Sequence, residues 1–334
     1  MRRRQFLGLL GGAAAWPLPA RAQQAAASRR LAIFSPFEPA ALMREDSDNR
    51  YYRALFDELR RLGHVEGKNL TVERYGRERS AGGLAALAVE VVSAKPDVVF
   101  VVGPGAMLFK RAEDGISVVA LTGDPVAQGM IQSLAHPGGN ITGVSVDTGP
   151  SIYGKRIVLL REMFPKLAKL GYLTLRTGQW EAGRGRDIRQ AGEAVGVEVI
   201  PSLVDLPTGE AVYRDAIAQA SRDGANAFMV DDNPETMANR TLIANLIATA
   251  ALPAIYPFAE FVEAGGLMAY SYDLVELNKR VASNIDGILR GANPGDIPFY
   301  QASKFELSIN LKAARALGLD ISPTLLATAD NVIE

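Results

Sequence analysis

Short apolar runs alternate with amphipathic stretches along most of this chain, and this alternation restricts its fold more than any other feature. In the first half we expect strands at 31–34, 70–75, 98–102 and 118–121, helices at 51–62 and 84–92, and a short helix that ends at 110–113. The run Val98-Val99-Phe100-Val101-Val102 is apolar at every position, as in strands that are buried on both faces. The order strand, helix, strand predicts a parallel sheet covered by helices on both sides.

The same order starts again after residue 150. The second half predicts helices at 152–163, 187–195, 212–220 and 236–250, and strands at 171–175, 197–200, 227–230, 253–256 and 266–270. Two consecutive units of similar size predict an α/β protein with two Rossmann-like lobes, each with a parallel sheet.

Glycine- and proline-rich segments separate these units and precede a C-terminal tail that is too short to form a domain. The tail must therefore return to one of the two units, so we expect lobes joined by a three-segment hinge. We assign residues 29–143 plus 272–297 to the N-terminal lobe and residues 144–271 plus 298–334 to the C-terminal lobe.

The first 22 residues are typical of a cleaved signal peptide. Arg2, Arg3 and Arg4 precede a short apolar stretch at 6–16, and Ala20-Arg21-Ala22 offers the small-x-small pattern after which signal peptidase cuts. We therefore expect export to the periplasm and cleavage after about Ala22. The stretch from Arg3 to Leu7 also fits the twin-arginine export pattern, and an ordinary secretory signal with an arginine-rich start is the alternative.

Composition excludes several classes of function. Removal of residues 1–22 takes away four arginines and leaves 32 basic residues against 37 acidic ones, so the mature chain has no basic surplus for nucleic acid. The chain has no cysteine, which rules out disulfides, thiolate chemistry and a lipid-modified cysteine. With only two histidines, a metal site or a catalytic triad is hard to build. We predict no metal and no cofactor.

Ligands of open α/β sheets bind beyond the carboxyl ends of the strands. The loops at those ends supply twelve candidate ligand-binding residues: Ser35, Phe37, Gly103, Pro104, Gly105, Thr122, Asp124, Arg176, Asp231, Asp232, Tyr256 and Tyr272. In the first lobe, Gly103-Pro104-Gly105 follows a buried strand and opens a helix, so its backbone N–H groups suit an anion; a plain tight turn is the alternative. Asp124 before Pro125 suits helix capping, and the N–H groups beside it and Thr122 suit a ligand carboxylate.

The second lobe offers charged candidates. Asp231 and Asp232 end a buried strand, and an uncompensated carboxylate there would bind a ligand ammonium group; helix capping is the alternative. Arg176 could pair with a second ligand carboxylate. Phe37, from the first lobe, and Tyr256 and Tyr272 could form flat apolar walls, although such side chains often belong to a core.

Several segments together resemble a known family. They are 62–69 (Leu-Gly-His-Val-Glu-Gly-Lys-Asn), 123–126 (Gly-Asp-Pro-Val), 137–143 (Pro-Gly-Gly-Asn-Ile-Thr-Gly), 265–268 (Gly-Gly-Leu-Met), 303–312 and the tail 323–334. In combination they resemble the exported substrate-binding proteins of ABC transporters with the periplasmic-binding-protein type I fold. The likeness is strongest to the subgroup that binds aromatic amino acids such as tryptophan or tyrosine, and it spans essentially the whole chain.

The resemblance implies a monomer that captures a small molecule by hinge closure and delivers it to an ABC permease in the inner membrane, without catalysis. It implies an amino acid or a related small carboxylate as ligand. The chain departs from the family at 176–180, where many members have an Asn-Pro-rich loop, so the ligand itself stays open.

The alternative is an exported NAD(P)-dependent oxidoreductase. Gly103-x-Gly105 after a strand, with Asp124 further on, imitates part of a dinucleotide fingerprint. Leu108 stands where the third glycine should be, and the motif does not open the first strand–helix unit, so we favour the binding protein.

Overall fold

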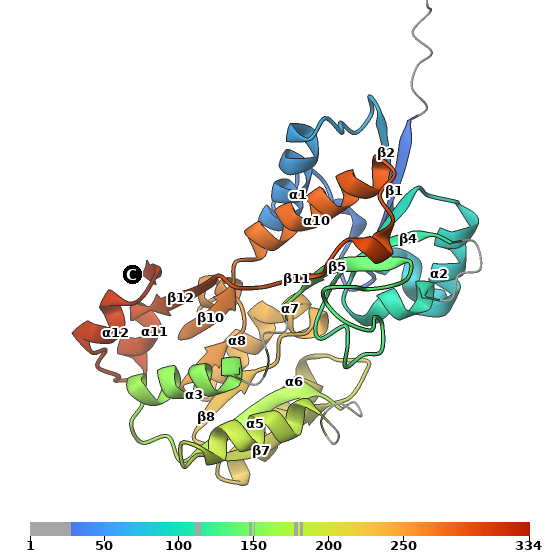
Figure 1. Cartoon of the computed structure of the whole chain (residues 1–334). Coiled ribbons are helices and arrows are strands. Elements are labelled where there is room, and N and C mark those ends of the chain that lie inside the picture. The colour runs from blue at the N-terminus through green and yellow to red at the C-terminus, as the bar shows by residue number, and fades with distance from the viewer. Residues whose placement is uncertain (1–27, 111–114, 147–148, 150, 177–179, 181–182) are drawn as a thin grey trace, which may run out of the picture.

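The computed structural model describes residues 28–110, 115–146, 149, 151–176, 180 and 183–334. The predicted signal peptide lies outside these ranges, as do residues 111–113, where the predicted short helix ends. The chain forms two α/β lobes, each built on its own sheet (Figure 1). This confirms the predicted fold class.

The sheet of the first lobe has the strand order β11-β5-β4-β3-β1-β2, and all of its pairs are parallel. Its strands are β1 (Arg29–Phe34), β2 (Leu70–Tyr75), β3 (Val98–Val102), β4 (Ser117–Thr122), β5 (Ile141–Ser145) and β11 (Tyr300–Gln301). Its helices and short 3₁₀ turns are η1 (Ala40–Leu42), α1 (Arg50–Arg61), η2 (Arg77–Gly82), α2 (Leu84–Ser93), η3 (Pro104–Phe109), α10 (Leu274–Leu289) and η4 (Pro294–Asp296).

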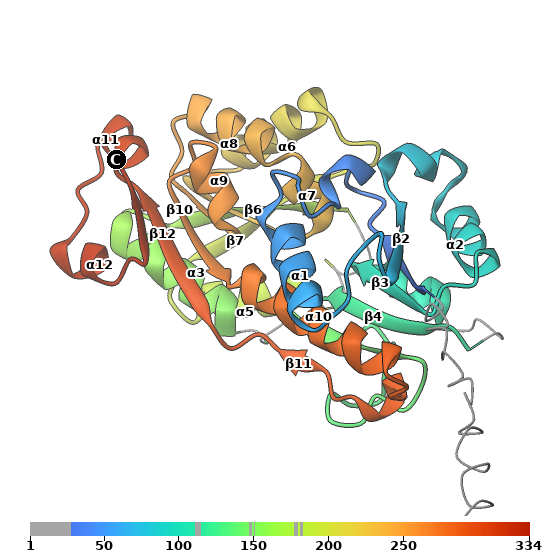
Figure 2. The ribbon, with the colours of Figure 1, turned by 90° about the horizontal axis from the view of Figure 1, so that it is seen from above.

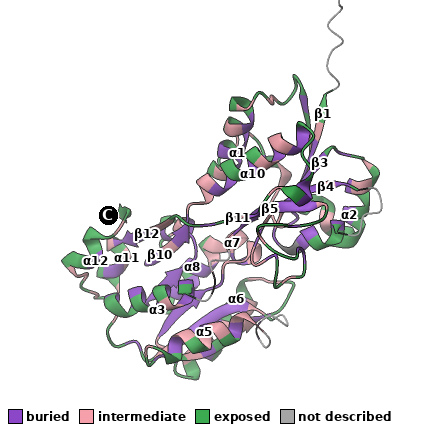
Figure 3. Cartoon of the chain, in the orientation of Figure 1, coloured by how far each residue is buried: buried purple, intermediate pink, exposed green. Residues whose placement is uncertain are grey.

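Alternate residues of these strands belong to two separate apolar cores. Ile33 and Phe100 lie in one core with α1 and α10, whereas Phe34 and Val101 lie in the other with α2 and η3. Successive side chains of a strand point to opposite faces, so strands that are apolar at every position require helices on both sides. The buried strands between partly exposed helices are visible in Figure 3.

The sheet of the second lobe has the order β13-β12-β10-β9-β8-β6-β7 and is parallel except for the antiparallel pair β10–β12. Its strands are β6 (Lys169–Leu175), β7 (Glu198–Val204), β8 (Ala227–Val230), β9 (Ala254–Tyr256), β10 (Met268–Tyr272), β12 (Phe305–Asn310) and β13 (Asn331–Ile333). Its helices are α3 (Ser151–Met163), α5 (Arg184–Glu193), α6 (Glu210–Arg222), α7 (Pro234–Ala238), α8 (Arg240–Thr249), α9 (Ala259–Glu263), α11 (Leu311–Ala316) and α12 (Pro323–Ala327).

The chain passes between the lobes three times: after β5, between β10 and α10, and between β11 and β12. Helix α10 therefore returns to the first lobe and packs beside α1, as both views of the ribbon show (Figure 2). Two of the lobe boundaries drawn from sequence need correction, because β5 continues to Ser145 and β11 pairs with β5. Residues 144–145 and 300–301 belong to the first sheet, since strand pairing continues beyond the glycine- and proline-rich turns.

Several elements differ from the expectation. The predicted helix 236–250 is two helices, α7 and α8, which meet at Asn239. Strands β5, β11, β12 and β13 and helices α9, α10, α11 and α12 were not predicted as elements. None of the helices within the described ranges is both long and apolar enough to cross a bilayer.

Candidate functional site

A cavity of about 470 Å³ lies between the two lobes, at the carboxyl ends of strands β1, β3 and β4 of the first lobe and β6 and β8 of the second. Both lobes contribute to its wall, as the strand-end rule requires. Its lining residues are Ser35, Phe37, Glu38, Asn49, Tyr51, Tyr52, Val102, Gly103, Leu121, Thr122, Gly123, Gln128, Val146, Tyr172, Thr174, Leu175, Trp180, Arg184, Asp231, Asp232, Asn233, Pro234, Glu235, Met237, Phe258, Leu274 and Asn278.

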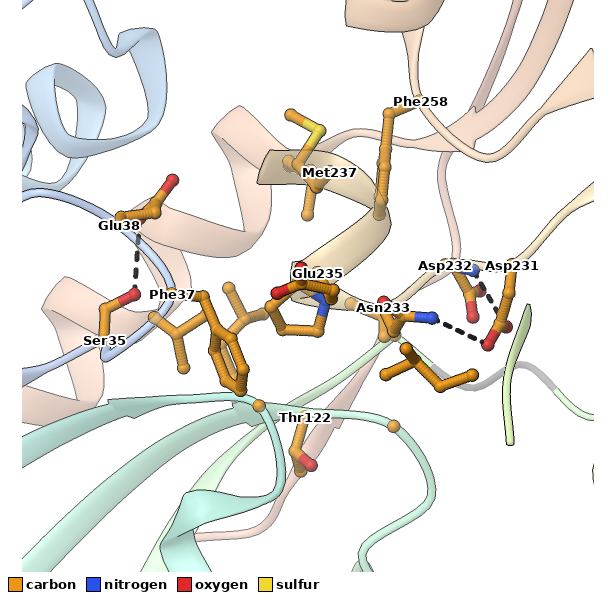
Figure 4. A pocket seen from close by; sticks show the side chains of 18 of the residues that line it. Ser35, Phe37, Glu38, Thr122, Asp231, Asp232, Asn233, Glu235, Met237 and Phe258 are labelled. Atoms are coloured by element: carbon orange, nitrogen blue, oxygen red, sulfur yellow. Dashed lines mark hydrogen bonds between the residues drawn. The ribbon is translucent and has the colours of Figure 1, made fainter. Parts of the chain in front are cut away.

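Half of the residues predicted from the strand ends line this cavity: Ser35, Phe37, Gly103, Thr122, Asp231 and Asp232. Figure 4 shows Ser35, Phe37 and Thr122 on the first-lobe side, with Asp231 and Asp232 well away from Ser35. Their contact with a ligand stays a prediction.

Gly105 and Asp124 of the first lobe do not line the cavity, and each has a structural reason. A Cβ on Gly105 would lie 2.9 Å from the Phe34 ring, so this glycine permits close packing of η3 on β1. Pro104 is the first residue of η3, and its contact with a ligand stays a prediction. The Asp124 carboxylate accepts hydrogen bonds from the backbone N–H groups of Val126 and Ala127 at 2.8 and 2.9 Å, which is the capping alternative.

The remaining predicted residues of the second lobe, Arg176, Tyr256 and Tyr272, do not line the cavity either. Arg176 is exposed and pairs with Asp205 at 2.9 Å. Tyr256 is buried in the core, where its ring stacks on Phe261 at 5.0 Å. Tyr272 lies behind the cavity wall and donates a hydrogen bond from its hydroxyl to Asp232. The strand-end rule places a residue near the site, but the direction of its side chain depends on tertiary packing.

Asp231 is at the centre of a buried polar cluster in the floor of the cavity. Its carboxylate accepts hydrogen bonds from Tyr172 Oη and Thr174 Oγ1, both at 2.7 Å, from Arg184 Nη1 at 2.6 Å and from Asn233 Nδ2 at 3.0 Å. Burial by itself would raise the pKa of Asp231, but the Arg184 charge and these hydrogen bonds outweigh it and hold the pKa below its usual value. Asp231 is therefore ionised and fully partnered.

Asp232 shares Arg184 with Asp231 and has Arg156 as a second cation. Its Oδ1 lies 3.1 Å from Arg184 Nη1, and its Oδ2 lies 3.7 Å from Nη1 of the buried Arg156. Arg156 also donates from Nε to the carbonyl of Tyr270 at 3.0 Å. The sequence predicted an uncompensated carboxylate here, and that is wrong, because two guanidinium groups offset the two carboxylates.

Arg184 and Trp180 line the cavity but were not among the predicted residues. Trp180 is buried and stacks on Tyr172 with ring centroids 5.8 Å apart. Arg184 is the first residue of α5, where a positive charge opposes the helix dipole. A basic residue at a helix start beyond a strand end was the available signal, since such a position needs an anionic partner.

Another carboxylate, that of Glu38, lies at the first-lobe side of the cavity. Glu38 accepts hydrogen bonds from Tyr52 Oη at 3.0 Å, Ser35 Oγ at 3.3 Å and Asn49 Nδ2 at 3.4 Å. Burial raises the pKa of Glu38, against the lowering effect of the Tyr52 and Ser35 hydrogen bonds. Figure 4 shows Glu38 and Asp231 at opposite sides of the view, so the two charged groups are well separated.

Direct contacts join the lobes around the cavity. Arg50 on α1 pairs with Glu260 at 2.7 Å and with Glu263 at 3.2 Å, both on α9 of the second lobe. At another point of the cleft, a Cβ on Gly103 would lie 3.2 Å from Cγ of Pro234. The structure therefore shows the lobes in contact across the cleft. Within the described residues there is no group of three or more His, Cys, Asp or Glu side chains that could hold a metal ion.

Comparison with known proteins identifies the family. The family model described as "ABC transporter substrate binding protein" matches residues 40–333. The chain belongs to this family. The match covers both lobes and all three crossings, so this substrate-binding protein has a small-molecule ligand and an ABC transporter as its partner system.

Individual relatives agree with this assignment. A tyrosine-binding protein of Clostridioides difficile (strain R20291) is 22% identical over 277 residues, which are 81% of this chain and 75% of the relative. A conserved domain protein from Vibrio cholerae has a TM-score of 0.80 at 21% identity, with 91% of this chain and 99% of that chain covered. An ABC domain from Streptococcus pneumonia, solved in complex with L-Trp, has a TM-score of 0.79 at 20% identity, with 92% and 100% covered.

These structural likenesses establish the two-lobed fold. The family match gives no support to the alternative of an oxidoreductase, since the matched family consists of substrate-binding proteins.

Proposed function

We propose that this protein captures an amino acid or a related small carboxylate in the cavity between its lobes and acts without catalysis. The observation that carries the proposal is the cavity itself, which combines apolar walls with charged groups from both lobes. Phe37, Trp180 and Phe258 provide aromatic surface, and Arg184 provides positive charge. The names of the relatives that bind tyrosine and L-Trp support an amino-acid-like ligand.

Capture proceeds by hinge closure about the three crossings. A ligand that touches both lobes favours the closed state by its differential affinity for that state. The Arg50 pairs with Glu260 and Glu263 favour contact between the lobes also without ligand.

The proposal includes export. The segment 1–22 directs the chain to the periplasm. Arg3 and Arg4 favour the twin-arginine route over the general secretory route. The closed monomer then delivers its ligand to the permease of an inner-membrane ABC importer. N-terminal sequencing of the protein recovered from the periplasm should give Gln23 as the first residue.

A ligand panel tests the proposed function. Thermal unfolding of the purified full chain is followed with amino acids, aromatic acids, sugars and nicotinamide dinucleotides, because a ligand that binds only the folded state raises Tm with concentration. We expect a shift with an amino acid or a small carboxylate. A shift with a dinucleotide alone would favour the oxidoreductase instead.

Charge reversal at the cleft edge should weaken capture. Arg50→Glu places a third acidic group beside Glu260 and Glu263, and like charges across an interface cost enough to weaken ligand binding about 10-fold. Isothermal titration with the ligand found in the panel measures the change, and Arg50→Glu combined with Glu260→Arg should restore part of the affinity.

Arg53→Glu is the matched control for this charge reversal. Arg53 lies on the same helix but donates to the carbonyl of Ser47 within its own lobe. Its reversal should leave ligand affinity unchanged. Equal loss in the Arg53 and Arg50 variants would show that net charge, and not contact between the lobes, controls binding.

A further inference from the structure

The Arg184 guanidinium is only partly used by the protein. Of its three nitrogen atoms, Nη1 donates to Asp231 and faces Asp232. Within the part of the chain that the structure describes, no acceptor takes a hydrogen bond from Nε or Nη2. These two atoms form one edge of the planar group, which is the edge that binds a carboxylate side-on through two parallel hydrogen bonds.

This edge lies where a ligand between the lobes can reach it. Arg184 lines the cavity, and its side chain is 23% exposed. A Cβ on Gly123 of the first lobe would lie 3.6 Å from Arg184 Nη2, so the group extends from the second lobe to the opposite wall of the cleft. The Asp231 carboxylate, which is 5% exposed and accepts bonds from four surrounding side chains, fixes Nη1 and thereby the orientation of the fork.

The charges in the cluster disfavour a ligand cation. Asp231 and Asp232 are offset by Arg184 and Arg156. One atom of each charge has no hydrogen-bond partner within the described residues: Nη2 of the buried Arg156, and Asp232 Oδ1, which has only the Arg184 charge 3.1 Å away. An ammonium group placed here would meet no net negative charge and would face a guanidinium. A carboxylate would gain a charge-assisted pair without loss of an existing one.

The side chains beside Arg184 indicate the rest of the ligand. The indole of Trp180 stacks on the Tyr172 ring, and the guanidinium carbon of Arg189 lies 4.8 Å from the Trp180 ring centroid. Trp180 and Leu175 are both part of the cavity wall. A flat or branched apolar body therefore fits next to the anion position.

We infer that Arg184 anchors a ligand carboxylate and that the ligand class is small carboxylates with an aromatic or apolar body, for which an α-ammonium group is not required. This inference rests on the proposed function, since it names the chemistry recognised in that same cavity. Asp231 and Asp232 are positioning residues that orient Arg184, not partners of a ligand amine.

A matched ligand series tests the inference on the unaltered protein. L-tryptophan, indole-3-propanoate and tryptamine share one aromatic body and differ only in the charged groups that they carry. By isothermal titration we expect the two carboxylates to bind within about 10-fold of each other and tryptamine at least about 100-fold more weakly, since hydrogen bonds to charged groups differ by that much. The series is repeated with the phenyl analogues L-phenylalanine, 3-phenylpropanoate and phenethylamine.

The possible outcomes separate the two proposals. Binding of the amines without binding of the des-amino acids would overturn the role of Arg184 and leave the proposed function intact. If no member of either series bound and only a sugar or a dinucleotide shifted Tm, the proposed function itself would fail, and this inference with it.

A variant pair gives a second, independent measurement. Arg184→Gln should weaken carboxylate binding about 10- to 100-fold and improve tryptamine binding, because Asp231 and Asp232 then lose their shared cation. Arg176→Gln removes the same charge from an exposed position outside the cavity and should change neither. Unchanged carboxylate affinity in Arg184→Gln would contradict the inference; if that variant does not fold, the ligand series alone decides.

Discussion

Asp231→Asn is expected to lower the free energy of unfolding by about 3 kcal/mol, the cost of removing one partner from a buried ion pair. The asparagine keeps the shape of the side chain but leaves Arg184 with only Asp232 and presents an N–H group to donors such as Tyr172 and Thr174. Urea denaturation followed by circular dichroism measures the loss.

Asp124→Asn is the matched control for this substitution. Asp124 caps a turn at the protein surface through two backbone N–H groups, and asparagine caps about as well as aspartate. The control should remain within about 0.5 kcal/mol of the wild type. If Asp231→Asn were as mild as the control, the buried cluster would not stabilise the second lobe.

The same comparison has a defined pH dependence. The pKa of Asp231 in the folded state lies below the ordinary value of 3.8 for an aspartate, so its stabilising contribution is present above that pH and is lost as the pH falls below it. The stability difference between the wild type and Asp231→Asn should therefore be constant from pH 7 to about 5 and shrink as the pH falls below about 4.

Gly143→Ala is expected to reduce stability by about 3 kcal/mol or more, because the new methyl group would overlap main-chain atoms that cannot move independently. Gly143 on β5 stands opposite Ala120 on β4, and a Cβ there would lie 1.9 Å from the Ala120 carbonyl oxygen and 2.7 Å from its nitrogen. Relief would require β4 and β5 to separate beside the first crossing. Thermal unfolding and the yield of folded protein report the effect.

Gly139→Ala tests whether the loss of stability in Gly143→Ala comes from the position of Gly143 or from the removal of any glycine of this segment. Gly139 belongs to the same glycine-rich segment, but a Cβ there would meet no atom within 4 Å. This variant should unfold like the wild type. Equal destabilisation of both variants would mean that backbone flexibility of the segment, and not the contact between β4 and β5, is what glycine provides.

The fold was predictable because its main signals are local. A strand such as β3, apolar at all five positions, and a helix such as α1, with apolar residues at helical spacing, show their burial in their own sequence. Strands β5 and β11 carry weaker patterns, since Gly143 interrupts the first and the second has only two residues. Helix α10 has apolar residues at helical spacing, among them Leu277, Val281 and Ile285, so its signal was local and the prediction overlooked it.

The sequence by itself determined the two α/β units, the strand ends at which a ligand would lie, and the resemblance to a family that the comparison then established. Only the tertiary structure decided which side chains face that position. It placed Arg184 and Arg156 against Asp231 and Asp232, turned Arg176 towards Asp205 and buried Tyr256 in the core. The physical reason is that charge balance in a cleft depends on segments far apart in the chain, whereas periodicity depends only on neighbours along it.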